Sequence, residues 1–492
     1  MADAIETGPA GWRIGSDVTG ISIDSRAVRP GHVFVAITGA SHDGHQFVEQ
    51  AIAQGAIAVV GEQQGRQLPV PYFVVPSSRI AAAELADAFY GHPSRKMQCI
   101  AVTGTNGKTS VVYWLTHTMR HAGLQTGMVS SVVNDTGANL YPASLTTPES
   151  PELQRLLKEM YDAHTSYAVV EVSSHGIVQN RTREVKFKTA ILTNITREHL
   201  DFHGTMDRYV RAKSRLFEDL PADGIGVLNA DDDNYYAVRQ RMTAPYISYG
   251  MRSGEVRAEV LADEAWSTTI RIIHPAFTGR VHIPHPGRYN VYNVLAVVTA
   301  AAWYGIDGDT IMSAIESLPP VPGRMHVMQQ GKSPMVIVDY AHTPDGLLQV
   351  LKAVSKLGQD EIWLVFGARG GRDRGKRPEM GSIAARWADH VILTTDSPYN
   401  EDAADIADQL AQGVRATSPG VLLATELDRR RAIEMAILSA KSQDLVIITG
   451  RGPEATQYIG EQEVRLVDAE VVQEILAMYS TAQEGSHASG IS

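Results

Sequence analysis

One glycine-rich loop constrains this chain more than any other feature. The loop TGTNGKT, residues 103–109, follows an apolar run at 99–102 that predicts a buried strand. It precedes residues 110–122, which predict a helix that ends before Gly123. In such a loop, backbone N–H groups and the positive end of the helix dipole face anionic oxygen atoms, and the lysine adds a full charge. The sequence therefore predicts a phosphate-binding loop at a strand–helix junction.

The loop departs from the generic Walker pattern. That pattern places a glycine five residues before Gly107, where this chain has Val102. The other positions of the pattern are present: Lys108 is placed to contact phosphate, and the hydroxyl of Thr109 is placed to bind Mg²⁺. The alternative interpretation is a chance glycine turn before a helix, and the agreement of strand, loop, lysine and helix argues against it.

Length and charge limit the class of protein. A chain of 492 residues is too long for one core and predicts two to four domains. The formal charge of −11 argues against broad binding to nucleic acid or to anionic membranes. The single cysteine, Cys99, cannot form an intrachain disulfide, which fits a reducing compartment. Because neither a signal-peptide pattern nor a bilayer-long apolar run is visible, we expect a cytoplasmic protein without membrane insertion.

Apolar, strand-like runs alternate with helical patterns along the chain, which predicts an α/β fold with parallel sheets. A turn-rich segment at 91–95 and a Pro-rich segment at 318–324 are the expected domain boundaries. We expect a small N-terminal α/β domain, a central P-loop ATPase domain with a parallel sheet, a C-terminal Rossmann-like domain and a disordered tail, at residues 1–97, 98–327, 328–480 and 481–492. The clearest predicted strands are 33–36, 57–60, 72–75, 167–172, 189–194, 225–229, 362–366, 391–395 and 445–449.

Several polar residues follow predicted strands, where ligands bind in open α/β sheets. Glu171 lies at such a strand end and is either an Mg²⁺ ligand or an exposed loop acid. The run 192–204 gathers His, Asp and Glu, but the chain offers neither a cysteine partner nor an HExxH pattern for zinc. Lys213 lies on or beside the apolar stripe of the next predicted helix. Its stem either covers apolar surface, or the lysine is buried and functional.

The order of these and further motifs resembles the Mur ligase family, and more narrowly its UDP-N-acetylmuramoyl-tripeptide synthetases (the MurE type). The resemblance covers nearly the whole chain, from about residue 20 to residue 475. It rests on TGTNGKT (103–109), LTTPES (145–150), EVSSHGIVQNR (171–181), TNITREHLDFHGTM (193–206), GRYNVYN (287–293), GRMH (323–326), DYAHTPD (339–345) and RDRGKRPEMG (372–381).

The resemblance implies ATP, Mg²⁺ and a CO₂-derived carbamate on Lys213 as cofactors. It implies that Thr109, Glu171 and His199 hold Mg²⁺. Lys108, Glu171, His199 and Lys213 are the implied catalytic residues. The implied ATP contacts are Gly104, Thr105, Asn106, Gly107, Lys108, Thr109, Ser110, Asn293, Arg324 and Asp339.

The resemblance also implies two substrates, a UDP-muramoyl dipeptide and a free amino acid. The N-terminal domain would bind the uridine diphosphate part through Ser25, Ser41 and His42. The implied contacts to the acceptor peptide are Thr146, Thr147, Ser173, Gln179 and Arg181. The candidates for the amino-acid pocket are Arg372, Asp396, Ser397, Tyr399, Gly450 and Glu454.

The chain departs from the family in the predicted amino-acid pocket. Diaminopimelate-adding members carry DNPR, where this chain reads DSPY at 396–399. Where family members carry GKGHE, this chain has GRGPE at 450–454. Where they carry GGDRD, this chain gains Arg369 and lacks an Asp. Tyrosine cannot replace the two-pronged carboxylate contact of arginine. We therefore expect an added amino acid other than standard meso-diaminopimelate.

We expect an ATP-dependent amide ligase, acting as a monomer, that adds an amino acid to UDP-N-acetylmuramoyl-L-alanyl-D-glutamate through an acyl phosphate in peptidoglycan precursor synthesis. The alternative is a MurE-like paralogue that uses another amino acid or acceptor in a specialised pathway. Folylpolyglutamate synthetase is disfavoured, because the long first domain has no role there. A binding protein without catalysis would not need Lys108, Glu171, His199 and Lys213 together.

Overall fold

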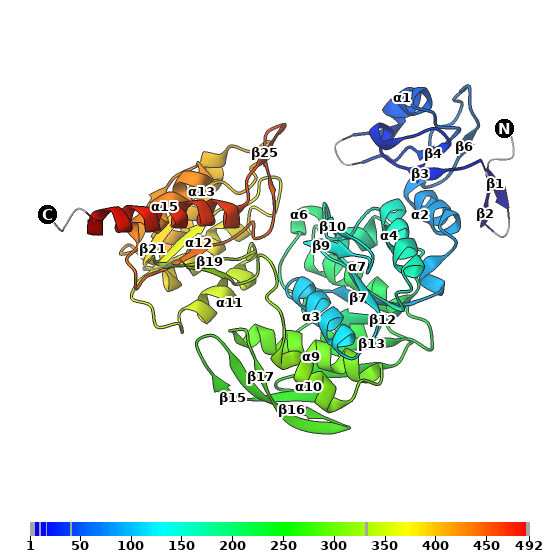
Figure 1. Cartoon of the computed structure of the whole chain (residues 1–492). Coiled ribbons are helices and arrows are strands. Elements are labelled where there is room, and N and C mark those ends of the chain that lie inside the picture. Colours follow the sequence, from blue (N-terminus) through cyan, green and yellow to red (C-terminus); the bar gives the residue numbers. More distant parts are fainter. Residues whose placement is uncertain (1–4, 9–10, 16, 40–41, 330–332, 489–492) are drawn as a thin grey trace.

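The computed structural model describes residues 5–8, 11–15, 17–39, 42–329 and 333–488. Three units, each built on its own sheet, follow one another along the chain (Figure 1). The N-terminal unit and the C-terminal unit lie on either side of the central unit in this view. No helix among the described residues is long and apolar enough to cross a membrane.

The N-terminal unit is a four-stranded parallel sheet in the order β3-β4-β5-β6. Val33, Val35 and Val60 are fully buried, because short β-branched runs pack well on a sheet covered by helices. The strands agree closely with the predicted ones. The elements are β1 (Ile5–Gly8), β2 (Gly11–Ile14), β3 (Gly20–Ser22), η1 (Ser25–Ala27), β4 (His32–Val35), η2 (Gly44–Phe47), α1 (Val48–Ala53), β5 (Ala58–Gly61), β6 (Tyr72–Val74), α2 (Ser78–Phe89) and η3 (Pro93–Arg95).

The central unit is an eleven-stranded sheet in the order β10-β9-β8-β11-β7-β12-β13-β14-β15-β16-β17. Strand β7 alternates sides: Ile100 and Val102 pack with α3 and α9 on one face, and Cys99 and Ala101 pack with α4 and α7 on the other. The elements are β7 (Gln98–Thr103), α3 (Lys108–His121), β8 (Thr126–Val129), β9 (Val133–Asp135), β10 (Leu140–Pro142), α4 (Ser150–Asp162), β11 (Tyr167–Glu171), α5 (Ser174–Val178), β12 (Phe187–Leu192), α6 (Leu200–His203), α7 (Met206–Glu218), β13 (Ile225–Asn229), α8 (Tyr235–Arg239), β14 (Tyr246–Gly250), β15 (Val256–Asp263), β16 (Thr268–His274), β17 (Phe277–Ile283), α9 (Arg288–Trp303) and α10 (Gly308–Glu316).

The expected parallel sheet is present from β8 to β15, but both edges differ from expectation, since β8, β9 and β10 also pair antiparallel. Strands β15, β16 and β17 pair antiparallel. Strand β15 starts with alternating buried and exposed residues, as a strand with one solvated face does. The alternation of strands and helices in the sequence did not distinguish this meander from the parallel part.

The C-terminal unit has a six-stranded sheet in the order β18-β19-β23-β20-β21-β22, parallel except at β18. Helices α11, α12 and α13 cover one face, and α14 and α15 cover the other, which is the expected Rossmann-like layering. The elements are β18 (His326–Met328), β19 (Met335–Val338), α11 (Pro344–Val354), β20 (Ile362–Phe366), α12 (Lys376–Trp387), β21 (His390–Leu393), α13 (Ala403–Thr417), β22 (Leu422–Thr425), α14 (Arg429–Ser439), β23 (Leu445–Ile448), β24 (Thr456–Ile459), β25 (Gln462–Arg465) and α15 (Asp468–Ala488).

The expected disordered tail needs correction. Helix α15 continues through residue 488, so residues 481–488 are helical, and residues 489–492 lie outside the described part. The tail is rich in Ser, Gly and Ala, a composition that predicts disorder. Ala482, Gln483 and Glu484 are nevertheless good helix formers, and they extend a helix whose earlier turns already pack on the sheet.

A buried ion pair joins α14 to the start of α15. Arg429 donates to both carboxylate oxygens of Asp468, at 2.8 and 2.7 Å, and to the carbonyl oxygen of Thr449 at 3.0 Å. Both side chains are completely buried. We expect Asp468→Ala to lower the free energy of unfolding by about 3 kcal/mol, because it leaves a buried guanidinium unpaired. Denaturant unfolding measures the loss. The double variant Arg429→Met/Asp468→Ala should recover part of it, and a double variant as unstable as Asp468→Ala contradicts this account.

Candidate active site

The phosphate loop lies where β7, β11 and β12 end. Gly104 and Gly107 adopt φ angles of 152° and 83°, which favour glycine. A Cβ atom on Gly107 would lie 2.3 Å from Oδ1 of Asn293, so glycine also leaves room for α9 to approach the loop. Helix α3 begins at Lys108, so its first N–H groups face the loop. The predicted strand, loop and helix are confirmed.

Thr109 and Glu171 meet beside this loop. Oγ1 of Thr109 lies 3.2 and 3.1 Å from the two carboxylate oxygens of Glu171, and the backbone N–H of Ser131 donates to Glu171 at 2.9 Å. Glu171 is 2% exposed, so it is not the exposed loop acid of the alternative interpretation. A buried hydroxyl–carboxylate pair at a phosphate loop suits Mg²⁺, which usually takes few protein ligands. The described residues contain no group of three or more His, Cys, Asp or Glu that could by itself hold a metal ion, so phosphate and water would complete the coordination.

Lys213 projects from α7 into the same region and is 1% exposed. Its ammonium donates to the carbonyl oxygen of Gly104 at 2.7 Å and lies 4.7 Å from the centre of the Tyr209 ring. Burial, and after it the nearby charge of Lys108, lowers the pKa of Lys213 well below its ordinary value. Of the two interpretations of Lys213, the buried lysine is confirmed. A lowered pKa favours the neutral amine, which is the form of a lysine that reacts with CO₂.

His199 stands at the edge of the loop with an unusual backbone. Its φ angle is 56°, and its Nδ1 atom is buried without a hydrogen-bond partner among the described residues. The His175 ring packs edge-on against the His199 ring, with the ring centres 4.6 Å apart. Burial, with His175 next, lowers the pKa of His199, so the imidazole is neutral. A neutral ring nitrogen without a protein partner is available to a metal ion.

The C-terminal unit closes over this region through polar contacts. Asn106 donates to Asp345 at 2.9 Å, and the buried ammonium of Lys376 donates to Glu198 at 3.0 Å. On the linker, Arg324 donates to Oγ1 of Thr109 at 3.0 Å. In Figure 1, α11 lies on the side of the C-terminal unit that is turned toward α3 of the central unit.

Asp339 has a structural task in addition to any nucleotide contact. Its carboxylate accepts hydrogen bonds from the backbone N–H groups of Met325 and Ala341, both at 2.7 Å. Burial raises the pKa of Asp339, and the nearby Arg324 opposes that shift. Asp339 therefore fixes the linker that carries Arg324.

The predicted acceptor residues gather around the end of β11. Thr147 donates to the carbonyl oxygen of Glu171 at 2.9 Å and lies 3.2 Å from the Ser173 hydroxyl. Arg181 donates to the carbonyl oxygen of Thr147 at 2.8 Å and to Gln179 at 2.6 Å. Thr146 is half-buried next to this group. These residues thus lie on the same sheet edge as the phosphate loop.

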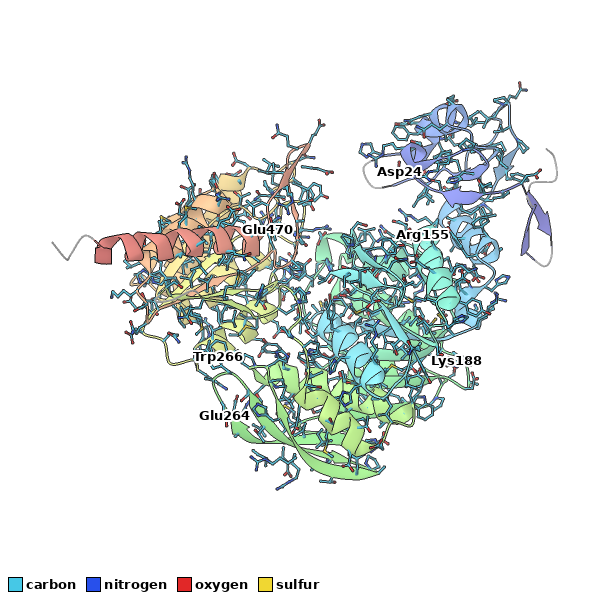
Figure 2. The ribbon with its side chains drawn as sticks, in the orientation of Figure 1. Asp24, Arg155, Lys188, Glu264, Trp266 and Glu470 are labelled. Atoms are coloured by element: carbon cyan, nitrogen blue, oxygen red, sulfur yellow. The ribbon has the colours of Figure 1, made fainter. Side chains whose placement is uncertain are left out.

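The candidate uridine-diphosphate contacts of the N-terminal unit do not lie among the predicted acceptor residues at the end of β11. Ser25 is buried and donates to Gln50 within its own unit at 3.0 Å. His42 is exposed, and Ser41 lies outside the described residues. Asp24, next to Ser25, lies on the side of its unit that faces the C-terminal unit in this view (Figure 2).

The predicted amino-acid pocket lies at the ends of β20, β21 and β23. Asp396 is 1% exposed, and Gly450 leaves space beside it, since a Cβ atom there would lie 3.0 Å from Oδ2 of Asp396. The hydroxyl of Ser397 is already used by the protein, because it accepts from Arg451 and from the backbone N–H of Tyr458, both at 3.2 Å.

Tyr399 adopts a φ angle of 52° and stacks on Tyr458, with ring centres 5.4 Å apart. Arg372 lies at the junction of the two units, 3.6 Å from Asp201. Glu454 is paired with Arg369, which the sequence analysis noted as a departure and did not assign to the site.

A small hollow of about 40 Å³ lies between the central and C-terminal units. It contains residues that the sequence analysis missed. Glu198 immediately precedes His199, and Lys376 is part of the RDRGKRPEMG motif, so both positions carried a signal. The hollow is lined by Glu198, His199, His342, Ala368, Arg369, Arg372 and Lys376.

A larger hollow of about 1220 Å³ lies elsewhere. It is lined by residues such as Gln98, Tyr167 and Phe187, at the amino ends of β7, β11 and β12. Most of the lysine and arginine side chains that line this hollow pair with a carboxylate. Lys188, for example, lies 2.5 Å from Asp223. Because ligands of open α/β sheets bind at the carboxyl ends of strands, this hollow is not the candidate site.

Comparison with known proteins agrees with this geometry. The chain matches the family models described as Mur ligase family, catalytic domain (17–90), Mur ligase middle domain (102–301) and Mur ligase, glutamate ligase domain (323–452). It is 39% identical to the UDP-N-acetylmuramoyl-L-alanyl-D-glutamate–2,6-diaminopimelate ligase of Bacillus velezensis, covering 92% of this chain and 93% of the relative. The enzyme of the same name from Phocaeicola vulgatus is 36% identical, over 94% and 95% of the two chains.

Solved structures give the same result. A 2,6-diaminopimelate ligase of that name matches with a TM-score of 0.62 and 30% identity, over 94% of this chain and 95% of that chain. MurF from Acinetobacter baumannii, at a TM-score of 0.69 and 21% identity over 89% and 91% of the two chains, shares the fold. The similarity extends over nearly the full length of the chain and agrees with the phosphate loop and the buried Thr109–Glu171 pair. The chain therefore belongs to the Mur ligase family.

Proposed function

We propose that this protein is an ATP-dependent ligase of the cytoplasm that joins an amino acid to UDP-N-acetylmuramoyl-L-alanyl-D-glutamate. The observation that carries the proposal is that Thr109, Glu171, Lys213 and His199 gather around one phosphate loop. The relatives named above support the choice of acceptor and of peptidoglycan precursor synthesis as the pathway. The domain limits 1–97, 98–327 and 328–480, for the UDP substrate, ATP and the amino acid, are part of this proposal.

Mg²⁺ fits the residues present. Thr109 and Glu171 would hold one ion and His199 a second, and the metal would neutralise charge on the transferred phosphoryl group. A carbamate on Lys213 would add a carboxylate-like group in this buried region.

Lys108 and Arg324 are the cations that hold the phosphates of ATP. The half-buried ammonium of Lys108 now donates to the carbonyl oxygen of Thr105 at 2.9 Å, a contact that a phosphate oxygen would replace. Arg324 approaches Thr109 from the linker that leads to the C-terminal unit, so its contact depends on how that linker is held. Asn293, beside Gly107, is the proposed adenine contact.

The reaction has two steps. A carboxylate oxygen of the acceptor attacks the γ-phosphorus, a new P–O bond forms, and the bond to ADP breaks. The neutral amine of the amino acid then attacks the acyl carbon, the amide C–N bond forms, the amine releases a proton, and phosphate leaves with the electron pair of the broken C–O bond. Thr147, Ser173 and Arg181 are placed to hold the acceptor beside Glu171.

Exclusion of water protects an acyl phosphate from hydrolysis. The Asn106–Asp345 and Lys376–Glu198 contacts hold the C-terminal unit over the loop. The linker that ends at Arg324 is the proposed hinge, because few residues join the two units there.

The proposal is tested by ADP release with single omissions. We expect release only when ATP, Mg²⁺, UDP-N-acetylmuramoyl-L-alanyl-D-glutamate and an amino acid are all present, with a product whose mass equals the two substrates minus water. ADP release that does not need the muramoyl dipeptide contradicts the proposed acceptor. That result would favour the second candidate, a paralogue with another acceptor. The altered pocket motifs at 396–399 and 450–454 support this candidate.

A further inference from the structure

One carboxylate, shared by two arginines, joins the N-terminal unit to the predicted acceptor residues. Oε1 of Glu149 lies 2.9 Å from Nη2 of Arg181, and Oε2 of Glu149 lies 3.4 Å from Nη1 of Arg79. The Arg79, Glu149 and Arg181 side chains are 23%, 25% and 12% exposed, so the three charged groups are largely withdrawn from water. Neither Arg79 nor Glu149 is among the acceptor contacts that the resemblance implies.

Arg79 is fixed to the N-terminal unit through the start of α2. The hydroxyl of Ser77 caps this helix by accepting from the backbone N–H of Ile80 at 3.4 Å. The backbone N–H of Ser78 donates at 2.7 Å to Glu62, which follows β5. Helix α2 in turn packs against α4 of the central unit (Figure 1). The position of the N-terminal sheet is therefore transmitted through Arg79 to the start of α4.

Glu149 and Arg181 belong to the central unit, and both have polar atoms that the protein leaves unused. Glu149 precedes the first residue of α4, but its side chain makes no capping hydrogen bond, so its carboxylate is left to the two arginines. Arg181 donates to Thr147 and Gln179, whereas its Nε atom is buried and has no hydrogen-bond partner among the described residues. A buried N–H group without an acceptor is costly. One donor of Arg181 is therefore available to an anionic ligand.

The charges of this trio do not balance. Two guanidinium groups share one carboxylate, and neither arginine pairs with another carboxylate in the described part of the chain. Burial lowers the pKa of Arg181; Glu149 opposes this shift, and the charge of Arg79 adds to it. The trio therefore favours the arrival of one further anion. The acceptor of the proposed reaction supplies one, because only one of the two carboxylates of its D-glutamate is phosphorylated and the other stays free.

We propose that Arg79 is a positioning residue for the acceptor: it holds Glu149, so that the guanidinium of Arg181 can bind the free carboxylate of the acceptor peptide. Without Arg79, Glu149 would pair with Arg181 alone, and this internal ion pair would compete with the acceptor for the same guanidinium. Arg79 acts through Glu149 and does not itself contact the acceptor.

The inference rests on the proposed function and deepens it. The N-terminal unit is proposed to bind the uridine diphosphate end of the acceptor, and Arg181 of the central unit is proposed to bind its peptide end. Because Arg79 moves with the first unit and Glu149 with the second, binding at the peptide end depends on how the two units are placed. The ion pair between Arg79 and Glu149 thereby links the two ends of one substrate.

The test replaces Arg79 by methionine in the ADP-release assay. We expect the KM for UDP-N-acetylmuramoyl-L-alanyl-D-glutamate to rise roughly 10-fold, the scale of one charge-assisted contact. The kcat and the KM for ATP should not change, because the phosphate loop is untouched. Arg79→Lys keeps the charge and should recover part of the loss. Arg95→Met is the matched control and should keep the wild-type KM, because Arg95 pairs at the same 3.4 Å with Asp87 of its own unit.

A second background separates positioning from mere support of α2. In Glu149→Gln no carboxylate competes for Arg181, so adding Arg79→Met should not weaken acceptor binding further. If Arg79 only docked α2, the loss would be the same in both backgrounds. Helix α2 also keeps the ion pair between Glu84 and Arg183 at 3.9 Å, which helps to hold it in place in these variants. Calorimetric titration with the acceptor gives the same comparison as a Kd and does not depend on turnover.

An acceptor whose free carboxylate is replaced by a carboxamide gives an independent readout. Its Kd should be the same for the wild-type protein and for Arg79→Met, because it offers Arg181 no carboxylate. The inference is overturned if Arg79→Met leaves the binding of the normal acceptor unchanged, or weakens it equally in the Glu149→Gln background or for the amidated acceptor. In these cases ADP release still requires the muramoyl dipeptide, so the proposed function stands. ADP release that does not require it overturns the proposed function and the inference with it.

Discussion

Replacing Lys213 by alanine is expected to lower the ligase rate by about 1000-fold, a loss typical of removing a preorganised charged group. The amine of Lys213 is buried against the phosphate loop, and burial lowers its pKa, which favours the neutral form that the proposed carbamylation needs. The alanine variant has no amine to carbamylate. Steady-state ADP release at fixed bicarbonate measures the effect.

Rescue separates a missing carbamate from a damaged fold. A short-chain carboxylic acid should restore part of the activity of Lys213→Ala, because it can enter the space of the lost side chain and supply a carboxylate. Lys158→Ala, at a lysine of α4 paired with Asp162 at the surface, is the control and should be fully active. A fully active Lys213→Ala would show that the assigned role of Lys213 is wrong.

The second large effect is expected at Glu171. Glu171→Gln should also reduce the rate by roughly 1000-fold. Its amide keeps the size of the side chain but loses the charge that we propose holds Mg²⁺ beside Thr109. The Mg²⁺ concentration for half-maximal rate should rise, whereas the KM for the amino acid should not change.

A matched carboxylate gives the control for Glu171. Glu218→Gln alters a partly exposed residue that pairs with Arg241 at 2.7 Å, far along α7 from the loop, and should leave the Mg²⁺ dependence intact. An unchanged Mg²⁺ dependence in Glu171→Gln would mean that Glu171 only supports the loop, as its hydrogen bond from Ser131 also allows.

The sequence predicted best what local patterns determine. The strand before Gly104 and the helix after Gly107 lie close to their expected residues, because apolar runs and glycine positions act over a few residues. Lys213 could be placed on the apolar side of α7 from its spacing, but whether it was buried depended on packing against the loop.

The missed features depend on contacts between distant segments. The Lys376–Glu198 pair joins residues 178 positions apart, and the Arg369–Glu454 pair joins residues 85 apart. The use of Ser397 by Arg451 and Tyr458 is likewise visible only once three loops converge. The altered motifs follow β20, β21 and β23, but the contact between Arg369 and Glu454 depends on how these strands lie in the sheet, which no motif encodes.

The central claim is that the acceptor carboxylate is activated as an acyl phosphate at the loop that begins at Gly104. The most direct test uses UDP-N-acetylmuramoyl-L-alanyl-D-glutamate with ¹⁸O in its γ-carboxylate. Complete turnover with ATP and an amino acid should transfer one ¹⁸O atom per reaction into inorganic phosphate, as mass spectrometry can measure. Phosphate without label, or label recovered in AMP, would contradict the account.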